Sequence, residues 1–586
     1  MSQLLESITV RATDSIDTVL RCQSSAVDRG LPAGIVIVSD SENQVEGVIT
    51  DGDIRRALIK DISRAHKLTA ADLMTQNPIT FPDTFSYRQI IDALPQRLSE
   101  RGRRSRKFLG KVLMVNEKNQ ATRVINYHEL WEQRVASHRH VVVLGLGYVG
   151  LTLALELSRE GFRVTGVDVS QDRIAKLKNN ESYVHEIGLP ELLRDQLNRN
   201  FFPTTQMPED GDVFIVSVGT PVLQESESGI PKPQLSQITS AATMVGKSLK
   251  PGSLVILRST VPVGCTRDIV IPILEQTSEL KAGRDFHVSF APERTVEGKA
   301  LRELRTLPQV IGGINKDSVE ATAALFRDLT PMLVRVDSLE SAELVKLINN
   351  TFRDLVFSYA NQLAQIGAHF NIDVVDVIRA ANHGYPRDKV PLPSPGVGGP
   401  CLTKDPYIMH EVSKRAGIES TLFLQGRVIN ESMCGTVADS LLEKLKSQGY
   451  DSGNTKILAC GLAFKGEPET GDLRSSTGAE IALDLKARGW NVVGHDPVAS
   501  AEDIRQIGLE AAEFDDAIGE AAVLLVLNNH RFYRNLDIAK FVRQMPERPI
   551  IFDTWHIFEP DLILDSKPCT YMGLGFTRSS LDHTDP

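Results

Sequence analysis

Two stretches near the start of the chain share one order of apolar and polar positions. Residues 34–58 hold an apolar strand, a polar turn, a second strand and a helix, and residues 111–132 repeat that order. An internal repeat is more informative than either copy alone. The pattern predicts a unit of two similar halves over residues 1–135, and residues 133–140 form a polar linker.

The next part of the chain alternates apolar strands with helices. Residues 140–170 run from an apolar stretch through a glycine-rich turn and an amphipathic helix to a second apolar stretch, which is the pattern of a βαβ unit. Further short apolar strands, with helical segments between them, follow at 213–219, 253–260 and 287–293. This alternation predicts a parallel, doubly wound sheet over residues 139–337.

A long helix is predicted in the third part, residues 338–450. Residues 341–370 contain no proline, their only glycine lies near the end, and their apolar positions recur at helical spacing. A loop rich in proline and glycine follows at 385–406, and the α/β pattern returns over 451–586. The predicted fold class is therefore α/β, with two Rossmann-like doubly wound domains joined by a long central helix and preceded by the repeated unit.

Length, charge and cysteine content narrow the possible functions. A chain of 586 residues is too long for one hydrophobic core. A net charge of -10 argues against a general nucleic-acid binder, which needs a basic surface. No apolar run is long enough to span a bilayer, and the first residues show no secretory signal. Six scattered cysteines without a CxxC pair indicate neither a metal site nor a redox pair, so we expect a reduced, cytoplasmic protein without bound metal.

The glycine-rich turn GLGYVG lies directly between a strand and a helix. Gly145 allows the tight turn, Gly147 lets the backbone approach a pyrophosphate, and Gly150 lets the helix and strand pack closely. Asp168 ends the next strand, where a carboxylate binds the ribose 2′-hydroxyl and repels a 2′-phosphate. A lone GxGxxG is a weak signal, but this context and Asp168 favour NAD as the cofactor, over NADP.

One cysteine lies in a setting that favours chemistry. Cys401 is surrounded by glycine and proline in GVGGPCLTKD, and Lys404 and Asp405 follow it. A nearby cation favours the thiolate, which is the nucleophilic form. A buried structural cysteine is the alternative, and we assign that role to the cysteines in apolar or helical runs: Cys22, Cys265, Cys434, Cys460 and Cys569.

Two pairs of polar residues have helical spacing. Lys346 and Asn350 are four residues apart on the long helix, so both can point at a developing oxyanion or form part of a solvated stripe. Spacing alone leaves both interpretations open. Glu293 and Glu297 follow a strand end, where ligands bind in doubly wound sheets, although surface acids also fit the pattern.

Over residues 139–586 the motifs resemble those of the UDP-glucose/GDP-mannose dehydrogenase family. The resemblance rests on an ordered set: GLGYVG, VGTP (218–221), STVPVG (259–264), PER…EG (292–298), ELVKLINN (343–350), GVGGPCLTKDP (396–406) and GLAFKGEPETGDLRSS (461–476). It implies two Rossmann-like domains joined by a long helix that carries a dimer interface. It also implies two successive NAD-linked oxidations at C6 of a nucleotide sugar.

The resemblance assigns roles to individual residues. Cys401 matches the nucleophile that forms a thiohemiacetal and then a thioester. Lys346 and Asn350 match the pair that steadies oxyanions, Asp405 the acid that works with the lysine, Glu293 the acid that assists hydrolysis, and Thr260 a threonine near the reaction centre. The implied cofactor contacts are Gly145, Gly147, Tyr148, Val149, Gly150, Asp168, Thr220, Pro221, Thr260 and Glu297. The implied substrate contacts are Glu293, Arg294, Lys346, Asn350, Arg353, Arg387 from a neighbouring subunit, Gly398, Lys465 and Arg474.

The N-terminal repeat resembles a CBS-domain pair, and GVITDGDIRRAL carries the likeness. The resemblance maps a regulatory nucleotide onto Thr50 and Asp53. The second half offers Asn126 and Glu129 at the matching positions, which departs from the pattern, although Glu129 can still bind a ribose of the regulatory nucleotide. The basic stretch 101–107 can hold phosphates or be a solvated surface. We therefore expect residues 1–135 to be a regulatory CBS-domain pair.

The sequence is compatible with several functions. The favoured one oxidises UDP-N-acetylglucosamine or UDP-N-acetylmannosamine to the uronic acid for surface polysaccharide precursors, because APER and Arg353 point to that branch. Lys404 in GGPCLTKD points instead to UDP-glucose. A β-hydroxyacid dehydrogenase and a nucleotide sensor on an inactive scaffold are the rivals, although the first lacks the thiol and the last domain. We expect a homo-oligomer, a dimer or larger.

Overall fold

The structure is a computed structural model that describes residues 3–28, 34–60, 62–85, 89, 90, 93, 97, 111–126, 139–224, 229–419 and 421–580. The chain divides into two compact units, each described by itself. The smaller unit comprises Met1–Arg139 and the short segment Arg159–Arg163, and the larger one holds His140–Ser158 and Val164–Pro586. Within these described ranges, no helix is both long and apolar enough to cross a membrane.

The smaller unit contains two small sheets. The first has the strand order β1 (Thr9–Val10), β2 (Ile35–Ser39), β3 (Val45–Thr50) and β4 (Thr75–Gln76). The second has the order β5 (Thr80–Pro82), β6 (Lys111–Val115) and β7 (Ala121–Asn126). The helices are α1 (Gln3–Glu6), α2 (Ile16–Asp28), α3 (Asp51–Lys60), η1 (Ile62–Lys67) and α4 (Ala70–Leu73). The predicted strand–turn–strand–helix order is confirmed in the first half.

The two hairpins of this unit have the same local geometry. β2–β3 and β6–β7 are antiparallel, and each register shifts at the last residue of its first strand. Asp40 and Asn116 accept hydrogen bonds from the backbone two and four residues ahead, because both turns are closed by a short polar side chain. The predicted internal repeat is therefore confirmed over the strands. The helix expected after β7 lies outside the described residues.

The larger unit begins with an eight-stranded sheet. Its spatial order is β10 (Phe201–Thr204), β9 (Arg163–Val167), β8 (His140–Leu144), β11 (Val213–Val216), β14 (Leu254–Leu257), β15 (His287–Phe290), β16 (Gln309–Gly313) and β17 (Leu333–Arg335). The neighbours whose register is known are parallel except for the antiparallel pair β15–β16, so the predicted parallel, doubly wound sheet is confirmed with one exception. The winding reverses between β8 and β11, where such sheets bind ligands.

Helices connect these strands, and the fully buried strands explain the unbroken apolar runs in the sequence. The helices are α7 (Tyr148–Arg159), α8 (Gln171–Lys178), α9 (Leu189–Gln196), α10 (Ser236–Ser248), the π-helical turn η3 (Thr266–Val270), α11 (Ile271–Ser278), α12 (Ala300–Thr306) and α13 (Lys316–Phe326). A separate hairpin, β12 (Val222–Gln224) and β13 (Pro231–Pro233), projects from this domain.

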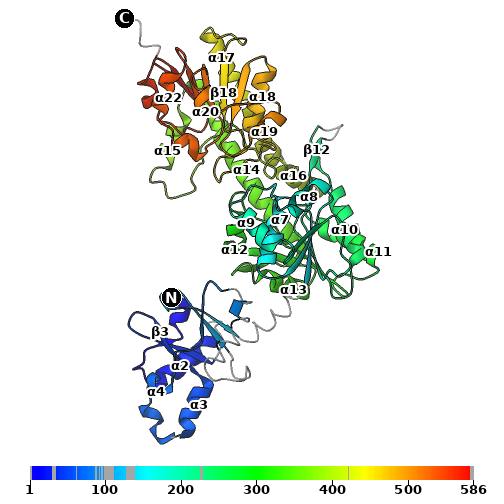
Figure 1. Ribbon diagram of the computed structural model, residues 1–586, viewed down its shortest axis with the longest axis vertical. Coiled ribbons are helices and arrows are strands. Elements are labelled where there is room, and N and C mark those ends of the chain that lie inside the picture. Colours follow the sequence, from blue (N-terminus) through cyan, green and yellow to red (C-terminus); the bar gives the residue numbers. More distant parts are fainter. Residues whose placement is uncertain are drawn as a thin grey trace. The chain divides into compact units, whose positions relative to one another are not determined.

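The predicted long helix is α14 (Leu339–Phe370), which runs between the two sheet domains of the larger unit (Figure 1). Ser338 caps its start through a hydrogen bond from Ser341 N–H, and Asn371 ends it in the left-handed conformation. Three further helices accompany it: α15 (Val374–Asn382), α16 (Asp405–Arg415) and α17 (Leu422–Ser447). α14 packs against α16 and α17, so the loop between α15 and α16 lies against a rigid helical support.

The last domain repeats the doubly wound plan. Its strands, in spatial order, are β20 (Glu510–Ala511), β19 (Asn491–His495), β18 (Lys456–Cys460), β21 (Val523–Val526), β22 (Ile550–Asp553), β23 (Thr570–Gly573) and β24 (Phe576–Ser579). The helices are α18 (Thr477–Ala487), α19 (Ala501–Gln506), α20 (Phe514–Ala517), α21 (Arg531–Arg534), α22 (Ile538–Gln544) and α23 (Pro560–Leu564). Only β24 is antiparallel to its neighbour. The α/β fold class with two Rossmann-like domains is confirmed.

One face of α14 is polar and buried. Its residues are spaced by three, four or seven positions, so they line one side of the helix: Glu343, Lys346, Asn350, Asp354 and Asn361. Lys346 and Asn350 are 7% and 9% exposed, so the interpretation as a solvated stripe was wrong. Buried polar groups need hydrogen-bond partners, and for this face those partners belong to loops of the functional site.

Candidate functional site

The turn GLGYVG joins β8 to α7, as predicted. Gly145 has a positive φ of 87°, and a methyl group on Gly150 would lie 1.8 Å from the Gly145 carbonyl oxygen. A methyl group on Gly147 would meet no atom within 4 Å. The first and third glycines are therefore required by the fold, whereas the second leaves open space beside the start of α7. That space suits the pyrophosphate of a dinucleotide.

Asp168 follows β9 at the edge of this turn. It is 5% exposed, and its carboxylate accepts hydrogen bonds from Leu146 N–H at 2.8 Å and Ser170 N–H at 2.9 Å. Arg173 lies 3.4 Å from the same carboxylate and over the ring of Tyr183, a position that sequence reasoning missed. Its place at the start of α8, five residues after Asp168, is the signal that was available.

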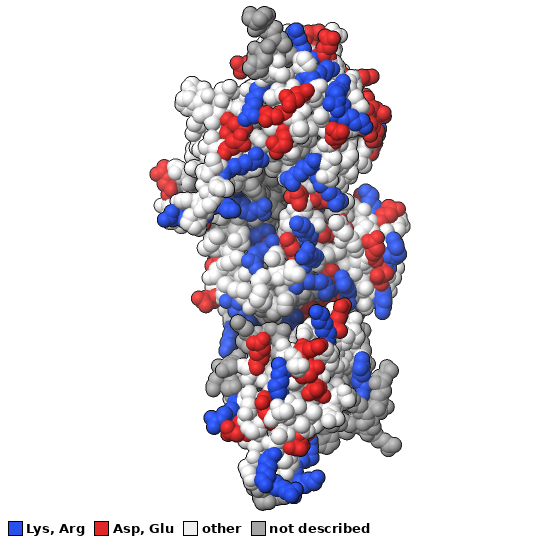
Figure 2. Space-filling model, turned by 90° about the vertical axis from the view of Figure 1, so that its left-hand side faces the viewer, with Lys and Arg blue, Asp and Glu red and all other residues white. Residues whose placement is uncertain are grey.

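A cleft of about 740 Å³ lies between the two α/β domains of the larger unit. Gly147, Tyr148 and Arg173 line it from the first domain, together with Glu297, and Arg474 lines it from the last domain. This volume is in the range of cofactor and small-molecule sites. Figure 2 shows one face of the molecule, on which Lys and Arg gather around a hollow in the larger unit and are elsewhere interspersed with Asp and Glu.

Four predicted catalytic residues form two buried pairs. Lys346 Nζ lies 3.4 Å from Glu293 Oε2, and Asn350 Nδ2 donates a 2.5 Å hydrogen bond to Asp405 Oδ2. Lys404 Nζ holds the other oxygen of Asp405 at 2.7 Å. These contacts join the long helix α14 to the loop after β15 and to the start of α16.

The charges of the first pair depend on each other. Burial alone raises the pKa of Glu293, but Lys346 and Arg258 outweigh it and lower that pKa below its ordinary value. Burial likewise lowers the pKa of Lys346, but Glu293, Cys401 and Asp405 outweigh it and raise that pKa. Both groups therefore stay ionised. Arg258, buried at the end of β14, was also missed from the sequence.

Cys401 precedes α16 and is exposed to solvent. Its carbonyl oxygen accepts the Asp405 N–H at 3.0 Å, which ties the cysteine to the start of that helix. The dense protein around the sulfur raises the pKa of the thiol, and Lys346 is the main group that opposes this rise. Lys404 also lowers the pKa of this thiol, as expected of a nearby cation, but burial outweighs both lysines, so the thiol form prevails in this state.

The remaining cysteines are Cys22, Cys265, Cys434, Cys460 and Cys569, and all but the half-buried Cys22 are buried. This burial agrees with the structural role assigned to them. Burial raises the pKa of Cys265 to about 12 and that of Cys569 to about 11. These thiols are therefore unreactive at neutral pH.

The threonines of two motifs meet beside this site. Thr220 Oγ1 donates to the Thr260 carbonyl oxygen at 2.6 Å, and Lys404 Nζ lies 3.4 Å from Thr220 Oγ1. Glu343 of α14 accepts hydrogen bonds from Gly264 N–H and Thr266 N–H and so fixes the STVPVG loop. Sequence reasoning missed Glu343, although it stands one turn before Lys346 in ELVKLINN.

Glu297 links the first α/β domain to the last one. Thr470 Oγ1 donates to its carboxylate at 2.9 Å, and Lys465 Nζ donates to its backbone carbonyl. Burial lowers the pKa of Lys465 to about 8 and raises the pKa of Glu297. Lys465 is thus a cation that gives up its proton readily. Arg474 is held by Asp472 on the same side of the cleft.

Most of the remaining predicted residues are exposed or bonded elsewhere, although Arg353 is near enough to Lys465 to lower the pKa of that lysine. Arg294 donates to the Pro308 carbonyl oxygen, and Arg353 is exposed on α14. Arg387 is exposed and bonds only to the Tyr385 hydroxyl, at 2.9 Å, among the contacts described. Gly398 packs against the last domain, since a methyl group there would lie 2.6 Å from the Ser475 carbonyl oxygen. Val149 is half-buried in α7 and Pro221 is exposed.

The predicted nucleotide residues of the smaller unit form a closed turn. Asp53 accepts hydrogen bonds from Thr50 N–H at 2.9 Å and Thr50 Oγ1 at 2.6 Å, and it pairs with Arg56. The two residues are therefore adjacent, as the resemblance implied. Glu129 and the basic stretch 101–107 lie outside the described residues, and so does the Asn126 side chain.

Comparisons with known proteins agree with this layout. Residues 139–330, 340–432 and 458–560 match the NAD-binding, central and UDP-binding domains of the UDP-glucose/GDP-mannose dehydrogenase family, and residues 3–60 match the CBS domain. The match to a UDP-binding domain argues against a β-hydroxyacid dehydrogenase.

Several relatives share most of the chain. A UDP-N-acetyl-D-mannosamine dehydrogenase of Methanococcus maripaludis is 32% identical over 427 residues, which cover 72% of this chain and 94% of the relative. The structure of the Pyrococcus horikoshii UDP-N-acetylmannosamine dehydrogenase matches with a TM-score of 0.66 and 28% identity, covering 74% of this chain and 99% of that one. The structure of the UDP-N-acetyl-mannosamine dehydrogenase Cap5O of Staphylococcus aureus matches with a TM-score of 0.64 and 31% identity. The match covers 74% of this chain and 98% of that one. The chain therefore belongs to the UDP-glucose/GDP-mannose dehydrogenase family and is an NAD-dependent UDP-sugar dehydrogenase with an N-terminal CBS domain.

Proposed function

We propose that this enzyme oxidises the C6 alcohol of a UDP-N-acetylhexosamine, N-acetylglucosamine or N-acetylmannosamine, to the carboxylate. The observation that carries the proposal is the thiol of Cys401, which stands within electrostatic reach of Lys346, Asp405 and Glu293. A single oxidation of an alcohol needs no nucleophile. A thiol beside an acid–base set is useful when an aldehyde must be held and oxidised again.

The overall reaction is R–CH2OH + 2 NAD+ + H2O → R–COO− + 2 NADH + 3 H+. Bound NAD supplies the hydride acceptor for each oxidation. In the first, the C6 hydroxyl gives up its proton as C6 loses hydride, which leaves an aldehyde. The Cys401 thiol then loses its proton to water and adds to the aldehyde carbon as the thiolate, while the carbonyl electron pair moves to oxygen. Lys346 Nζ and Asn350 Nδ2 are the donors we assign to this oxyanion.

The second half of the reaction releases the acid. As C6 loses a second hydride, the oxyanion collapses to a thioester carbonyl on Cys401. Water then adds to this carbonyl and passes a proton to a carboxylate. Because its lowered pKa keeps Glu293 ionised, we assign it this proton, with Asp405 positioned by Asn350 and Lys404. The carbon–sulfur bond breaks and the thiolate is restored.

The identity of the sugar rests on the similar proteins. Relatives that share more than two thirds of the chain carry names of UDP-N-acetyl-D-mannosamine dehydrogenases. UDP-glucose is the second candidate, because Lys404 of GGPCLTKD is part of the site through Asp405. A role in supplying surface polysaccharide precursors and a cytoplasmic location stay predictions. The six free cysteines fit a reducing compartment.

The choice of NAD over NADP depends, in our proposal, on Asp168. Its buried carboxylate lies at the end of β9, next to the open space at Gly147. A carboxylate there accepts hydrogen bonds from ribose hydroxyls and repels a phosphate. Arg173 pairs with Asp168, so part of its charge is already neutralised and offers little to a 2′-phosphate.

We propose that two copies of the chain pair through the outer face of α14. Five large apolar residues, spaced by four or seven, are exposed on one side of this helix: Ile348, Phe352, Tyr359, Ile366 and Phe370. They lie opposite the buried polar face, and exposed apolar surface of this kind marks an interface. We propose that the surface is covered by a second copy of the chain, because Arg387 of that copy can then reach the substrate of the first. Within its own chain, the described hydrogen bond of Arg387 goes to the Tyr385 hydroxyl and not to the site.

The smaller unit is proposed to regulate the enzyme by binding a nucleotide at Thr50 and Asp53. All the catalytic residues named above lie after residue 139, so the reaction does not need this unit. The unit affects the rate only if its ligand binds differently to two states of the enzyme. Asp53 is turned inward to Thr50 in this structure, so a nucleotide must compete with or extend that turn.

The first prediction tests the reaction. Wild-type enzyme should release two NADH for each UDP-N-acetylhexosamine consumed in a panel of UDP-sugars. Cys401→Ser should lower acid formation at least about 10³-fold, because no thioester can form. Its affinity for NAD and UDP should change little. Full conversion to the acid by Cys401→Ser would show that the cysteine mechanism is wrong.

A second prediction concerns the cofactor. Asp168→Ala should weaken NAD binding about 10-fold, since hydrogen bonds to a buried carboxylate are lost, and should narrow the preference for NAD over NADP. The measurement is kcat/KM for both cofactors at saturating UDP-sugar. UDP affinity serves as the control. If the variant has the same kcat/KM as wild type with NAD and with NADP, Asp168 does not select NAD.

Sedimentation will test the α14 interface. Phe352→Glu combined with Ile366→Glu should halve the particle mass, because two charges are buried in the proposed apolar contact. Leu562→Glu, an equally exposed apolar position in α23, is the matched control and should keep the wild-type mass. An unchanged mass in the double variant would reject this face as the interface.

Nucleotide titrations will test regulation in the full chain. AMP, ADP or ATP should change wild-type activity about fivefold or more, in the range of ordinary allosteric coupling. Asp53→Ala should remove the response while keeping the basal rate. Asp17→Ala, on the surface of α2 in the same unit, should respond as wild type does. If all three respond alike, the site is not at Asp53.

A further inference from the structure

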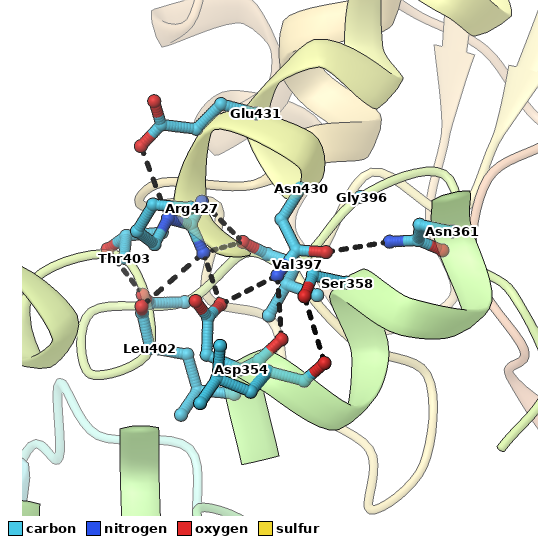
Figure 3. A network of polar contacts seen from close by, with 12 residues as sticks. Asp354, Ser358, Asn361, Gly396, Val397, Leu402, Thr403, Arg427, Asn430 and Glu431 are labelled. Carbon is cyan, nitrogen blue, oxygen red and sulfur yellow. Dashed lines mark hydrogen bonds and ion pairs between the residues drawn. The ribbon is translucent and has the colours of Figure 1, made fainter. Parts of the chain in front are cut away.

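Arg427 and Asp354 form an ion pair in the interior of the larger unit. Arg427 on α17 is 2% exposed and Asp354 on α14 is 1% exposed. Nη1 of the arginine donates to Asp354 Oδ1 at 2.7 Å, as Figure 3 shows. Neither residue has a part in the chemistry proposed above. A buried ion pair gives little net stability, because both charges lose their hydration.

Arg427 Nε donates to Glu431 Oε1 on the same helix at 3.2 Å, whereas its two Nη groups also reach the loop that carries the cysteine. Nη1 and Nη2 both donate to the Val397 carbonyl oxygen at 3.3 Å, and Nη1 also donates to the Leu402 carbonyl oxygen at 3.4 Å. These two carbonyl groups flank Cys401 in the sequence. One guanidinium therefore holds the loop before and after the thiol, as its planar fork of donors allows.

Two asparagines extend the network along the loop (Figure 3). Asn430 Nδ2 donates to both the carboxylate and the backbone carbonyl of Asp354, and Asn361 Nδ2 donates to Asn430 Oδ1 at 2.9 Å. Asn361 in turn accepts the Ser394 N–H at 2.8 Å. The loop is thus fastened to α14 and α17 at Ser394, Val397 and Leu402, although it has no regular secondary structure.

The ion pair stands next to the catalytic residues on the same helix. Asp354 follows Asn350 by one turn. Asn350 Nδ2 donates to the Asp405 carboxylate, and the Asp405 N–H donates to the Cys401 carbonyl oxygen. The face of α14 that holds the oxyanion donors also holds, through Arg427, the loop with the nucleophile. A shift of the loop changes the distance from sulfur to the reacting carbon without moving Lys346.

We propose that Arg427 and Asp354 are positioning residues that place the Cys401 thiol for capture of the aldehyde. This inference rests on the proposed function. The first oxidation, R–CH2OH + NAD+ → R–CHO + NADH + H+, does not use the thiol. The pair therefore matters for the second oxidation, and its loss lets aldehyde leave before the carbon–sulfur bond forms.

The test compares the two oxidations in the full-length enzyme. In Arg427→Gln, NADH released per UDP-sugar consumed should fall from two towards one, and hydroxylamine should trap the missing product as an oxime. Acid formation should drop about 100-fold, the cost of a small misplacement of reacting groups. Arg427→Lys should give values between those of wild type and Arg427→Gln. Its ammonium keeps the positive charge but cannot donate to Asp354 and both carbonyl groups at once. Arg488→Gln, which loses a surface pair with Asp439 of the same helix α17, should behave as wild type.

A second readout needs no substrate. The rate at which iodoacetamide alkylates Cys401, followed by peptide mass, should differ from wild type by about threefold or more in Arg427→Gln and Asp354→Asn, because the thiol changes its surroundings. If Arg427→Gln yields no soluble enzyme, the positioning role is tested with Asp354→Asn and Arg427→Lys. The same two quantities are measured: NADH released per UDP-sugar and the alkylation rate of Cys401. A lower melting temperature alone does not alter the NADH ratio.

The outcomes separate the two claims. Active variants that keep two NADH per sugar and the wild-type alkylation rate overturn the positioning role, whatever their stability. Wild-type enzyme that forms no NADH from any UDP-sugar overturns the proposed function, and the alkylation rates then still judge the positioning of the loop.

Discussion

The site depends on the burial of one polar face of a single helix. Glu343, Lys346, Asn350, Asp354 and Asn361 lie on one side of α14, and each is bonded to a different segment. A buried polar group that loses its hydrogen-bond partner lowers the stability by about 1–3 kcal/mol, so moving any of these segments away from the helix is unfavourable. The helix acts as a template that holds three loops and the helices α16 and α17, all from distant parts of the sequence, in fixed positions.

The same arrangement controls charge. Lys346 sits among Glu293, Asp405 and Cys401, and their attraction outweighs the cost of its burial. The thiol itself has a raised pKa, so the resting enzyme holds it protonated and less prone to oxidation. Nucleophilic reactivity then has to be gained when the substrate is in place, through Lys346 and the nearby carboxylates. This order suits an enzyme whose thiol is needed only after the first oxidation.

Local patterns made much of the fold predictable. The repeat at 34–58 and 111–132, the GLGYVG turn and the long helix all depend on neighbours in the sequence. Helix spacing also put Lys346 and Asn350 on one face, but it could not say that the face is buried. That burial depends on α16 and α17, which pack against α14 from positions 55 and more residues away.

Long-range pairs were the part that the sequence did not reveal. Asp354 and Arg427 are 73 residues apart, and Glu343 binds Gly264 across 79 residues, so no local period links them. The antiparallel pairing of β15 with β16 was also hidden, because both strands are short, buried apolar runs of the kind found in parallel sheets. The protonation of Cys401 was hidden for a similar reason: the sequence shows the cation Lys404 beside the thiol, but not the burial that outweighs its effect on the thiol pKa.

The most direct test of this account is to observe the covalent intermediate. In Glu293→Gln, hydrolysis should be slowed while Lys346 and Cys401 remain in place. After mixing with NAD and a UDP-N-acetylhexosamine, the Cys401 peptide should gain the mass of the acyl group, and hydroxylamine should remove it. Formation of NADH with an unmodified Cys401, or an adduct on another residue, would contradict the account.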